Sequence, residues 1–322
     1  LERFSPSMYE LVTNNAILAE DKHLPIYDEL KGMPNVEFIA GGATLNAIRV
    51  CQWCLHDRPG STAYIGCIGK DEFGTTLETC VKKDGVSPYF KITEEVGTGT
   101  CAVLVHKKDR SLCANLAAAN KYEISHLQQD EITKVYESAK IFYIAGFFLT
   151  VSLPTILAIG EHCAKEAKIM CMNLSAPFIP QFFGSQLAEA IKYVDFLFGN
   201  ETEAETYGKV NNLKDCSLEA VAAHIAALPK ANESRKRIVV FTQGMNQTLI
   251  VQDGEDPIAV AVPQLDADKI VDLNGAGDAF VGGFLSRLLS GATPSVAAEA
   301  GHKAARFIIQ RSGTVLEGKP DF

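Results

Sequence analysis

The sequence predicts an α/β fold, a three-layer α/β/α sandwich with a mostly parallel central sheet and a small β lid. From about Gly41 onward, apolar segments of strand length alternate with amphipathic helices, which is typical of βαβ units. The strand segments are nearly continuously hydrophobic, as a sheet covered on both faces requires. Two stretches, 16–42 and 97–120, break this rhythm with shorter alternating patterns, and we expect them to pair as the lid.

The elements follow in order along the chain. The expected strands are 63–69, 141–146, 169–174, 194–199 and 238–242. The expected helices are 43–56, 72–84, 125–138, 153–165, 181–192, 201–207, 217–228, 277–289 and 295–311. Segments 100–105 and 111–116 flank a charged stretch, which predicts a hairpin with a charged tip. We expect a lid subdomain of 1–47 plus 95–122 and a large α/β domain of 48–94 plus 123–322.

Charge and composition exclude several classes of protein. The formal net charge is -9, and no basic face or tail stands out, which argues against nucleic-acid binding. No apolar run approaches the roughly 20 residues of a membrane-spanning helix, so no membrane partner is expected. Nine cysteines without regular spacing indicate free thiols in a reducing cytoplasm.

The segment Asn274-Gly275-Ala276-Gly277-Asp278 precedes apolar residues at helical spacing, so two glycines open a helix with a carboxylate in its first turn. Free amides and the positive end of a helix dipole suit a transferring phosphoryl group. A carboxylate would repel a bound phosphate, so its presence needs another reason. Acceptance of a proton from the attacking hydroxyl provides that reason and predicts a kinase with Asp278 as catalytic base.

This segment allows other interpretations. Asp278 could simply complement the helix dipole, which on its own explains an acidic residue in a first turn. A dinucleotide fingerprint fails because Phe280 occupies the third glycine position. No Walker A sequence occurs, since Gly69-Lys70 is followed by Asp71.

Polar residues recur at the carboxyl ends of the expected strands, where open α/β sheets bind ligands. They are Asn173, Asn200, Glu203, Thr242, Gly244, Asp272 and Asn274. Asn200 and Glu203 have the form of a capping box. They could also orient water around Mg²⁺, and both roles are compatible.

Three further positions carry open alternatives. Gly41-Gly42 opens a helix in which Asn46 could bond substrate hydroxyls, although a tight turn would look the same. Arg110 at the hairpin tip is either a solvated charge or a lid residue that reaches the phosphoryl group. His302 lies near the expected nucleotide side or packs in the core.

The chain resembles the ribokinase-like carbohydrate kinases, the phosphofructokinase-B family, and within them the members that act on adenosine. Gly41-Gly42, Asn46 and the segment 272–280 carry the general family signature. The more specific resemblance lies in 15–22, 109–120, 144–150, 173–178, 198–204 and 319–322. It covers essentially the whole chain.

The resemblance implies transfer of the ATP γ-phosphate to the 5′-hydroxyl of adenosine. The catalytic site and the ATP site would both lie in the large domain. The amides of Gly275, Ala276 and Gly277 would form an anion hole, with Arg110 from the lid and Gly42 and Asn46 on the ribose. The resemblance also implies apolar walls around the adenine base from Leu18, Cys101, Leu112, Leu116 and Phe148. It implies ATP contacts from Asn200, Thr242, Gly244, Asn274 and His302. Glu203 would hold Mg²⁺ through water, and a monovalent cation would bind near Asp272 and Ser312.

We also expect a monomer in the cytoplasm, and in the nucleus as well. One departure is expected to matter: family members begin with a strand that supplies a ribose-binding Asp, and none precedes Leu1, so we expect upstream residues. The competing hypotheses are a sugar kinase of the same fold and a catalytically inactive nucleoside-binding protein.

Overall fold

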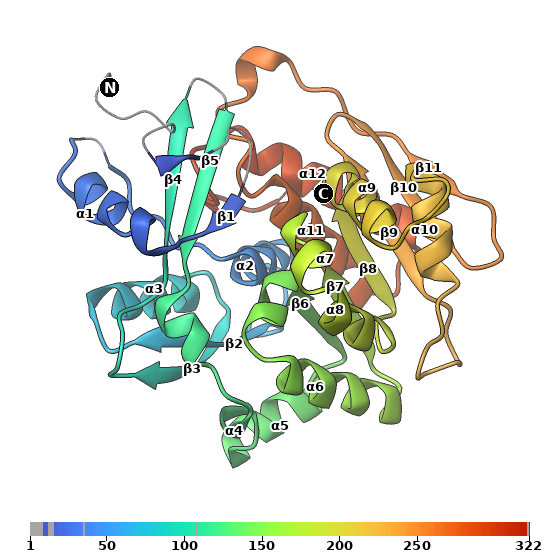
Figure 1. Cartoon of the computed structure of the whole chain (residues 1–322), viewed down its shortest axis with the longest axis horizontal. Helices are drawn as coiled ribbons and strands as arrows, with labels where there is room; N and C mark the ends of the chain where they lie inside the picture. Colours follow the sequence, from blue (N-terminus) through green and yellow to red (C-terminus); the bar gives the residue numbers. More distant parts are fainter. Residues whose placement is uncertain (1–8, 12–15, 35, 107–108, 321) are drawn as a thin grey trace. The chain divides into compact units, whose positions relative to one another are not determined.

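The computed structural model describes residues 9–11, 16–34, 36–106, 109–320 and 322. Figure 1 traces the elements in chain order. The chain packs into two compact units. Unit 1 comprises Leu1–Tyr122, Leu265–Ala279 and Ala304–Asp321, and unit 2 comprises Glu123–Gln264, Phe280–Lys303 and Phe322. These units are defined by how closely their residues pack, which does not show whether a segment moves as a lid. The division into a lid subdomain and a large domain therefore stays a prediction.

Unit 2 contains a six-stranded sheet in the order β11-β10-β9-β8-β7-β6. Its strands are β6 (Ile141–Ala145), β7 (Ile169–Asn173), β8 (Phe196–Asn200), β9 (Ile238–Gln243), β10 (Asn246–Gln252) and β11 (Ile258–Val260). The four strands from β6 to β9 are parallel, which confirms the predicted segments. β10 and β11 extend the sheet antiparallel and were not predicted.

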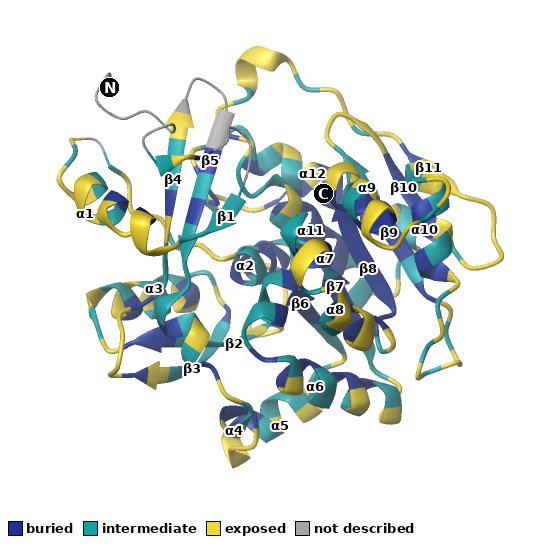
Figure 2. Ribbon diagram, viewed as in Figure 1, coloured by how far each residue is buried: buried dark blue, intermediate teal, exposed yellow. Residues whose placement is uncertain are grey.

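Helices cover both faces of this sheet. Met170, Met172 and Leu197 belong to one apolar core with residues of α6 (Leu153–Lys165), α8 (Gly184–Ile191) and α10 (Leu218–Ala226). Phe198 points to the opposite face because neighbouring residues of a strand alternate. Its ring packs edge-on against Phe284 of α11 (Ala276–Leu289), with centroids 5.1 Å apart. The strands are therefore largely buried, as Figure 2 shows, and unit 2 has the predicted three layers.

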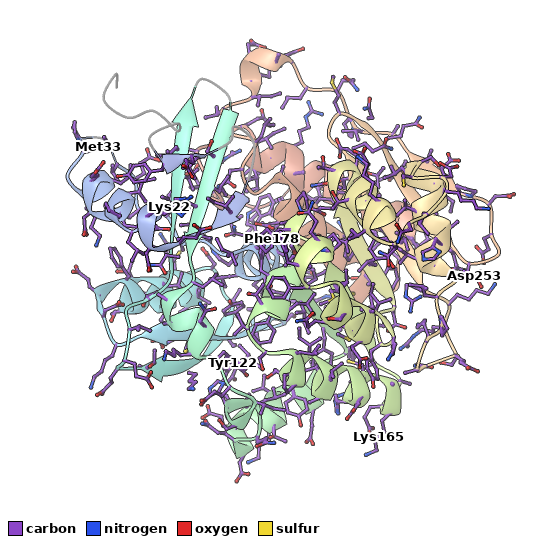
Figure 3. The ribbon with its side chains drawn as sticks, in the orientation of Figure 1. Lys22, Met33, Tyr122, Lys165, Phe178 and Asp253 are labelled. Carbon is purple, nitrogen blue, oxygen red and sulfur yellow. The ribbon has the colours of Figure 1, made fainter. Side chains whose placement is uncertain are left out.

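The other helices are α2 (Ala43–Cys54), α3 (Glu72–Lys83), α9 (Glu201–Val210) and α12 (Pro294–Ile308). The prediction of one helix over 125–138 was wrong, because Gln129 adopts an extended backbone and separates α4 (Ile124–Leu127) from α5 (Asp130–Ser138). The helix expected from 181 starts at Gly184, since α7 (Phe178–Phe182) precedes it. Phe178, labelled in Figure 3, packs on Phe147 of η4 (Gly146–Thr150) with centroids 6.0 Å apart.

Unit 1 contains two small sheets. β2 (Ala63–Gly69) and β3 (Ser87–Thr93) are parallel. β1 (Ala16–Leu18), β5 (Asp109–Asn115) and β4 (Thr100–His106) form the second sheet in that order, and β4 and β5 are the predicted hairpin. α1 (Pro25–Lys31) packs Ile26 with Ala102 and Cys113 on one face of this sheet. Residues 107 and 108 of the predicted charged tip lie outside the described residues.

Across the described ranges, every helix is too short or too polar to cross a membrane. All nine cysteines lie in those ranges, and no disulfide joins any of them.

Candidate active site

The start of α11 is shaped by two glycines with different constraints. Gly275 has φ +77°, and a Cβ there would lie 2.8 Å from Thr314 Oγ1, so only glycine fits without strain. Gly277 is exposed, and among the described residues a Cβ there would meet no atom within 4 Å. Packing within the described chain does not require glycine at 277, so its small size leaves the helix start open to a ligand.

The backbone amides at this turn are partly engaged. The Ala276 amide donates to the Leu273 carbonyl over 3.3 Å, a long hydrogen bond. The Asn274 amide donates to Asp272 Oδ1 at 2.7 Å, and the Gly313 amide donates to Asp272 Oδ2 at 3.2 Å. Asp272 therefore ties the loop before α11 to the segment after α12. The predicted anion hole of Gly275, Ala276 and Gly277 stays a prediction, with one of its three amides already hydrogen-bonded.

Asp278 lies in the first turn of α11, half-buried, and Asn46 Nδ2 donates to its Oδ2 at 3.0 Å. Burial raises the pKa of Asp278 to about 7, and the hydrogen bond from Asn46 opposes part of that rise. A carboxyl group that titrates near neutral pH is matched to general-base work. The raised pKa suits Asp278 to its predicted role as the base, and that role stays a prediction.

Gly42 and Asn46 lie beside this carboxyl. Gly42 has φ +113° before the first residue of α2, and its carbonyl accepts from the Asn46 amide at 2.7 Å. No hydrogen-bond donor of the described chain reaches the buried Asn46 Oδ1. Because an unbonded buried acceptor is costly, this oxygen is suited to receive a hydrogen bond from a ligand hydroxyl.

Three of the residues predicted to wall the base share one face of the sheet β1-β5-β4. Leu18 pairs with Ala114, which pairs with Cys101, and laterally paired residues lie on the same face. Leu112 is two residues before Ala114 and so shares that face. Leu116 follows β5 at the start of η3 (Ala117–Lys121). The opposite face carries the core against α1, so the predicted wall residues occupy the face without that core.

Arg110 lies in β5 at the register position opposite Val105. Its side chain lies outside the described part of the chain, so its predicted role at the phosphoryl group stays a prediction.

In unit 2, residues predicted to contact ATP end neighbouring strands. Asn200 of β8 pairs with Thr242 of β9, and Thr242 Oγ1 donates to the Gly199 carbonyl at 3.4 Å. Gly244 follows with φ +56° in the turn to β10. The half-buried Phe148, predicted to contact the base, lies in η4 of the same unit.

Asn200 and Glu203 form the capping box that their spacing allows. Asn200 Oδ1 accepts from the Glu203 amide at 2.9 Å, and the Glu203 carboxylate accepts from the Asn200 amide at 3.0 Å and from Asn200 Nδ2 at 2.9 Å. Within the described ranges, no group of three His, Cys, Asp or Glu side chains could hold a metal ion. Mg²⁺ would thus meet one buried, hydrogen-bonded carboxylate here, which fits contact through water.

His302 and Ser312 have protein partners. His302 is 5% exposed, its Nε2 bonds Thr248 Oγ1 at 2.8 Å, and its ring lies 5.3 Å from that of Phe280. These are the contacts of a core histidine, and burial lowers its pKa. Ser312 Oγ donates to Glu37 Oε2 at 3.0 Å. The predicted roles of His302 at ATP and of Ser312 at a cation stay predictions.

Two residues that support the site were not predicted from the sequence. Thr314 packs its hydroxyl against Gly275. Arg49 is 3% exposed and lies three residues after Asn46 in α2. An arginine within the apolar run around Val50 was the available signal, because buried arginine needs several acceptors.

The chain is similar to known carbohydrate kinases. Residues 7–320 match the family described as pfkB family carbohydrate kinase. Adenosine kinase 2 of Arabidopsis thaliana is 47% identical over 314 residues, which cover 98% of this chain and 90% of the relative. Adenosine kinase of Dictyostelium discoideum is 43% identical, over 96% of this chain and 89% of the relative.

Solved structures are similarly close. Anopheles gambiae adenosine kinase in complex with P1,P4-di(adenosine-5) tetraphosphate superposes with a TM-score of 0.96 at 46% identity, over 98% of this chain and 93% of that one. Schistosoma mansoni adenosine kinase in complex with 2-fluoroadenosine gives 0.94 at 38% identity, with the same coverage of 98% and 93%. The chain therefore belongs to the pfkB family of carbohydrate kinases.

Proposed function

We infer that this chain transfers the γ-phosphate of ATP to the 5′-hydroxyl of adenosine, giving AMP and ADP. The relatives that are 47% and 43% identical are adenosine kinases, and the match extends over nearly their whole length. The observation that carries the chemistry is the half-buried Asp278 carboxyl, held by Asn46 at the glycine-flanked start of α11. This arrangement places a base that can accept a hydroxyl proton beside a helix terminus that can bind a phosphoryl group.

Asn46 and Asp278 would align the acceptor together. Asn46 Oδ1, the buried acceptor without a donor in the described chain, receives a hydrogen bond from a ribose hydroxyl, while Asp278 faces the 5′-hydroxyl. A ribose hydroxyl is far too weak an acid for Asp278 to ionise it in advance. In a loose transition state the proton moves late, as the metaphosphate-like group is captured. Alignment therefore contributes more to the rate than prior deprotonation.

Charge on the transferring group is balanced by donors at the start of α11. The amides of Gly275 and Gly277 lie at the positive end of the helix dipole. Donors fixed in advance stabilise developing charge without reorganisation. Arg110 adds a guanidinium from β5 when the lid closes, and closure excludes water that would hydrolyse ATP.

ATP is contacted by five predicted residues: Asn200, Thr242, Gly244, Asn274 and His302. Glu203 would hold Mg²⁺ through water, and the ion, when bound, neutralises charge on the phosphates. A monovalent cation is proposed near Asp272 and Ser312, where Asp272 already accepts two backbone amides.

The adenine base is placed against the apolar face that carries Leu18, Cys101 and Leu112, with Leu116 and Phe148 as further walls. Apolar walls favour a purine over a bare sugar, because a sugar offers hydroxyls that such a surface leaves unbonded. We place the enzyme in the cytoplasm and also the nucleus, as a monomer; the absence of disulfides among its nine cysteines is consistent with a reducing compartment.

A panel of acceptors tests the function. ADP formation from ATP is measured with adenosine, ribose, fructose and no acceptor. We expect fast ADP release with adenosine alone, accompanied by equal AMP. Fast turnover of ribose without adenosine turnover would show a sugar kinase. Adenosine binding by calorimetry without ADP release would show an inactive nucleoside-binding protein.

A further inference from the structure

Arg49 is a buried cation that joins three segments of unit 1. It is 3% exposed, and its Nε donates to Asp84 Oδ2 at 2.6 Å. Its Nη1 donates to the Ala40 carbonyl at 3.0 Å and its Nη2 to the Thr314 carbonyl at 3.2 Å. All three guanidinium nitrogens are therefore used, each on a different segment, a geometry for which the planar fork of arginine is suited.

The bond to Ala40 reaches the first glycine segment. Ala40 directly precedes Gly41 and Gly42, and the positive φ of Gly42 sets the entry into α2. Fixing the Ala40 carbonyl against α2 therefore limits how this turn can hinge. Asn46 lies on the same helix, so Arg49 fixes the glycine turn relative to the asparagine that bonds Asp278.

The bond to Thr314 reaches the second glycine segment. Thr314 Oγ1 lies where a Cβ on Gly275 would be 2.8 Å away, so the two are packed as closely as glycine permits. The neighbouring Gly313 amide holds Asp272, which holds the Asn274 amide. The loop before α11 thus rests on the segment whose carbonyl Arg49 anchors.

The two anchored segments also touch each other. Gly313 has φ +68°, and a Cβ there would lie 2.7 Å from Ile39 Cδ1. Arg49 therefore spans a junction at which the segment before Gly41 packs on the segment beneath Gly275. Asp84, just after α3, balances its charge in this interior.

We propose that Arg49 is a positioning residue that holds the glycine turns at Gly42 and Gly275 in register for phosphoryl transfer. The proposal rests on the proposed function, because the two turns matter together only if acceptor and phosphoryl group meet beside them. Arg49 is buried and hydrogen-bonded within the protein, so it acts through Ala40 and Thr314.

The test compares Arg49→Lys with Arg237→Lys, measuring kcat, KM for adenosine, melting temperature and amide hydrogen exchange. Lysine keeps the charge facing Asp84 but cannot reach both carbonyls from one nitrogen. We expect kcat per folded Arg49→Lys molecule to fall about 10- to 100-fold, the cost of displacing reacting groups by around 1 Å. Exchange should quicken in peptides covering 36–46 and 270–278.

Arg237 is the matched control. It is buried, and its guanidinium donates only to carbonyls in the described part of unit 2: those of Ile191, Val194, Ile225, Leu228 and Pro229. Arg237→Lys should lower the melting temperature while leaving kcat per folded molecule and exchange in those two peptides unchanged. If Arg49→Lys behaves in the same way, its role is structural and the proposal is wrong.

Asp84→Ala is the second variant, and it tests the proposal if Arg49→Lys does not fold. It removes the acceptor that orients the Arg49 guanidinium and leaves the buried charge unpaired, so the guanidinium should shift away from the two carbonyls. Asp84→Ala should quicken exchange in the same two peptides and lower kcat by a smaller factor; unchanged exchange and kcat would overturn the proposal. Failure of the proposed function is visible separately, as a wild-type chain that does not phosphorylate adenosine. Hydrogen exchange still tests Arg49 in that case, since it needs no substrate.

Discussion

Single residues determine whether the carboxyl at the start of α11 can act as a base. Three influences act on Asp278: the helix dipole and the Asn46 amide favour its charged form, and burial favours its neutral form. Burial prevails, since the pKa is raised to about 7. The group therefore changes charge close to physiological pH.

The first prediction concerns this titration. Asp278 must be deprotonated to accept the hydroxyl proton, so kcat/KM for adenosine should fall as the pH drops below about 7. The measurement is kcat/KM over the pH range in which circular dichroism shows a constant fold. A profile that stays flat well below pH 7 would contradict the assigned pKa.

Asn46→Ala should move the acidic limb of that profile upward. The Asn46 amide stabilises the charged carboxylate, so its removal leaves burial less opposed and raises the pKa of Asp278. KM for adenosine should also rise, since the ribose loses its acceptor. An acidic limb that stays in place would show that Asn46 does not tune the base.

Asp278→Asn should stabilise the folded chain at alkaline pH. Because the folded-state pKa is raised, the stabilisation from a protonated Asp278 is present below about pH 3.8 and is lost as pH rises through about 7. An asparagine side chain does not ionise, so the variant loses no stability as the pH rises. Each pKa unit corresponds to about 1.4 kcal/mol, and partial exposure reduces it, so we expect a gain on the order of 2 kcal/mol at pH 8.

Urea unfolding of both proteins at pH 8 and pH 4.5 measures this difference. The gain should shrink at pH 4.5, where the wild-type carboxyl is largely protonated in the folded state. Equal stabilities at both pH values would show that burying the Asp278 charge costs nothing.

Secondary-structure elements show what a single sequence can predict. The strands from β6 to β9 follow from apolar runs bounded by turns, because a sheet covered on both faces leaves a strong pattern. β11 did not follow, since its three residues at the sheet edge are too few for such a run. β10 was missed although Leu249, Ile250 and Val251 form a short apolar run. The break at Gln129 was missed because no glycine or proline marks it.

The candidate site was predictable where local motifs carry it. A glycine next to a helix start, as at Gly42 and Gly275, predicts a positive φ at its own position. Contacts between distant segments do not: neither the Asn46–Asp278 hydrogen bond nor the anchoring of Ala40 and Thr314 by Arg49 has a local signature. Such pairs depend on how the elements pack.

The sheet β1-β5-β4 is predicted to provide a wall for the adenine base. Leu112→Ala should raise KM for adenosine about tenfold, because a buried leucine contributes at least ~1.5 kcal/mol of apolar contact. Leu104→Ala in the neighbouring strand is the control, since Leu104 packs on the core with α1. That change should lower the melting temperature and leave KM unaltered. The reverse pattern would place the base elsewhere.

Across the entire chain, the negative net charge opposes the binding of ATP, so positive groups at the site must outweigh it. The chain carries a formal net charge of -9, which repels ATP at long range. Salt screens that repulsion over about 10 Å at 0.1 M, whereas donors in contact with a phosphate are little screened. Binding of nucleotide therefore depends on helix termini and cations at the site, and the acidic surface does not prevent kinase activity.

We propose above that Asp278 serves as the base for phosphoryl transfer to adenosine. The most direct measurement is single-turnover formation of AMP from adenosine and ATP by wild type and Asp278→Asn at pH 8, with adenosine affinity measured in parallel. We predict that Asp278→Asn lowers the rate by at least ~10², the usual size of a lost general base, with adenosine still bound. Near-normal AMP formation by the variant would contradict the claim.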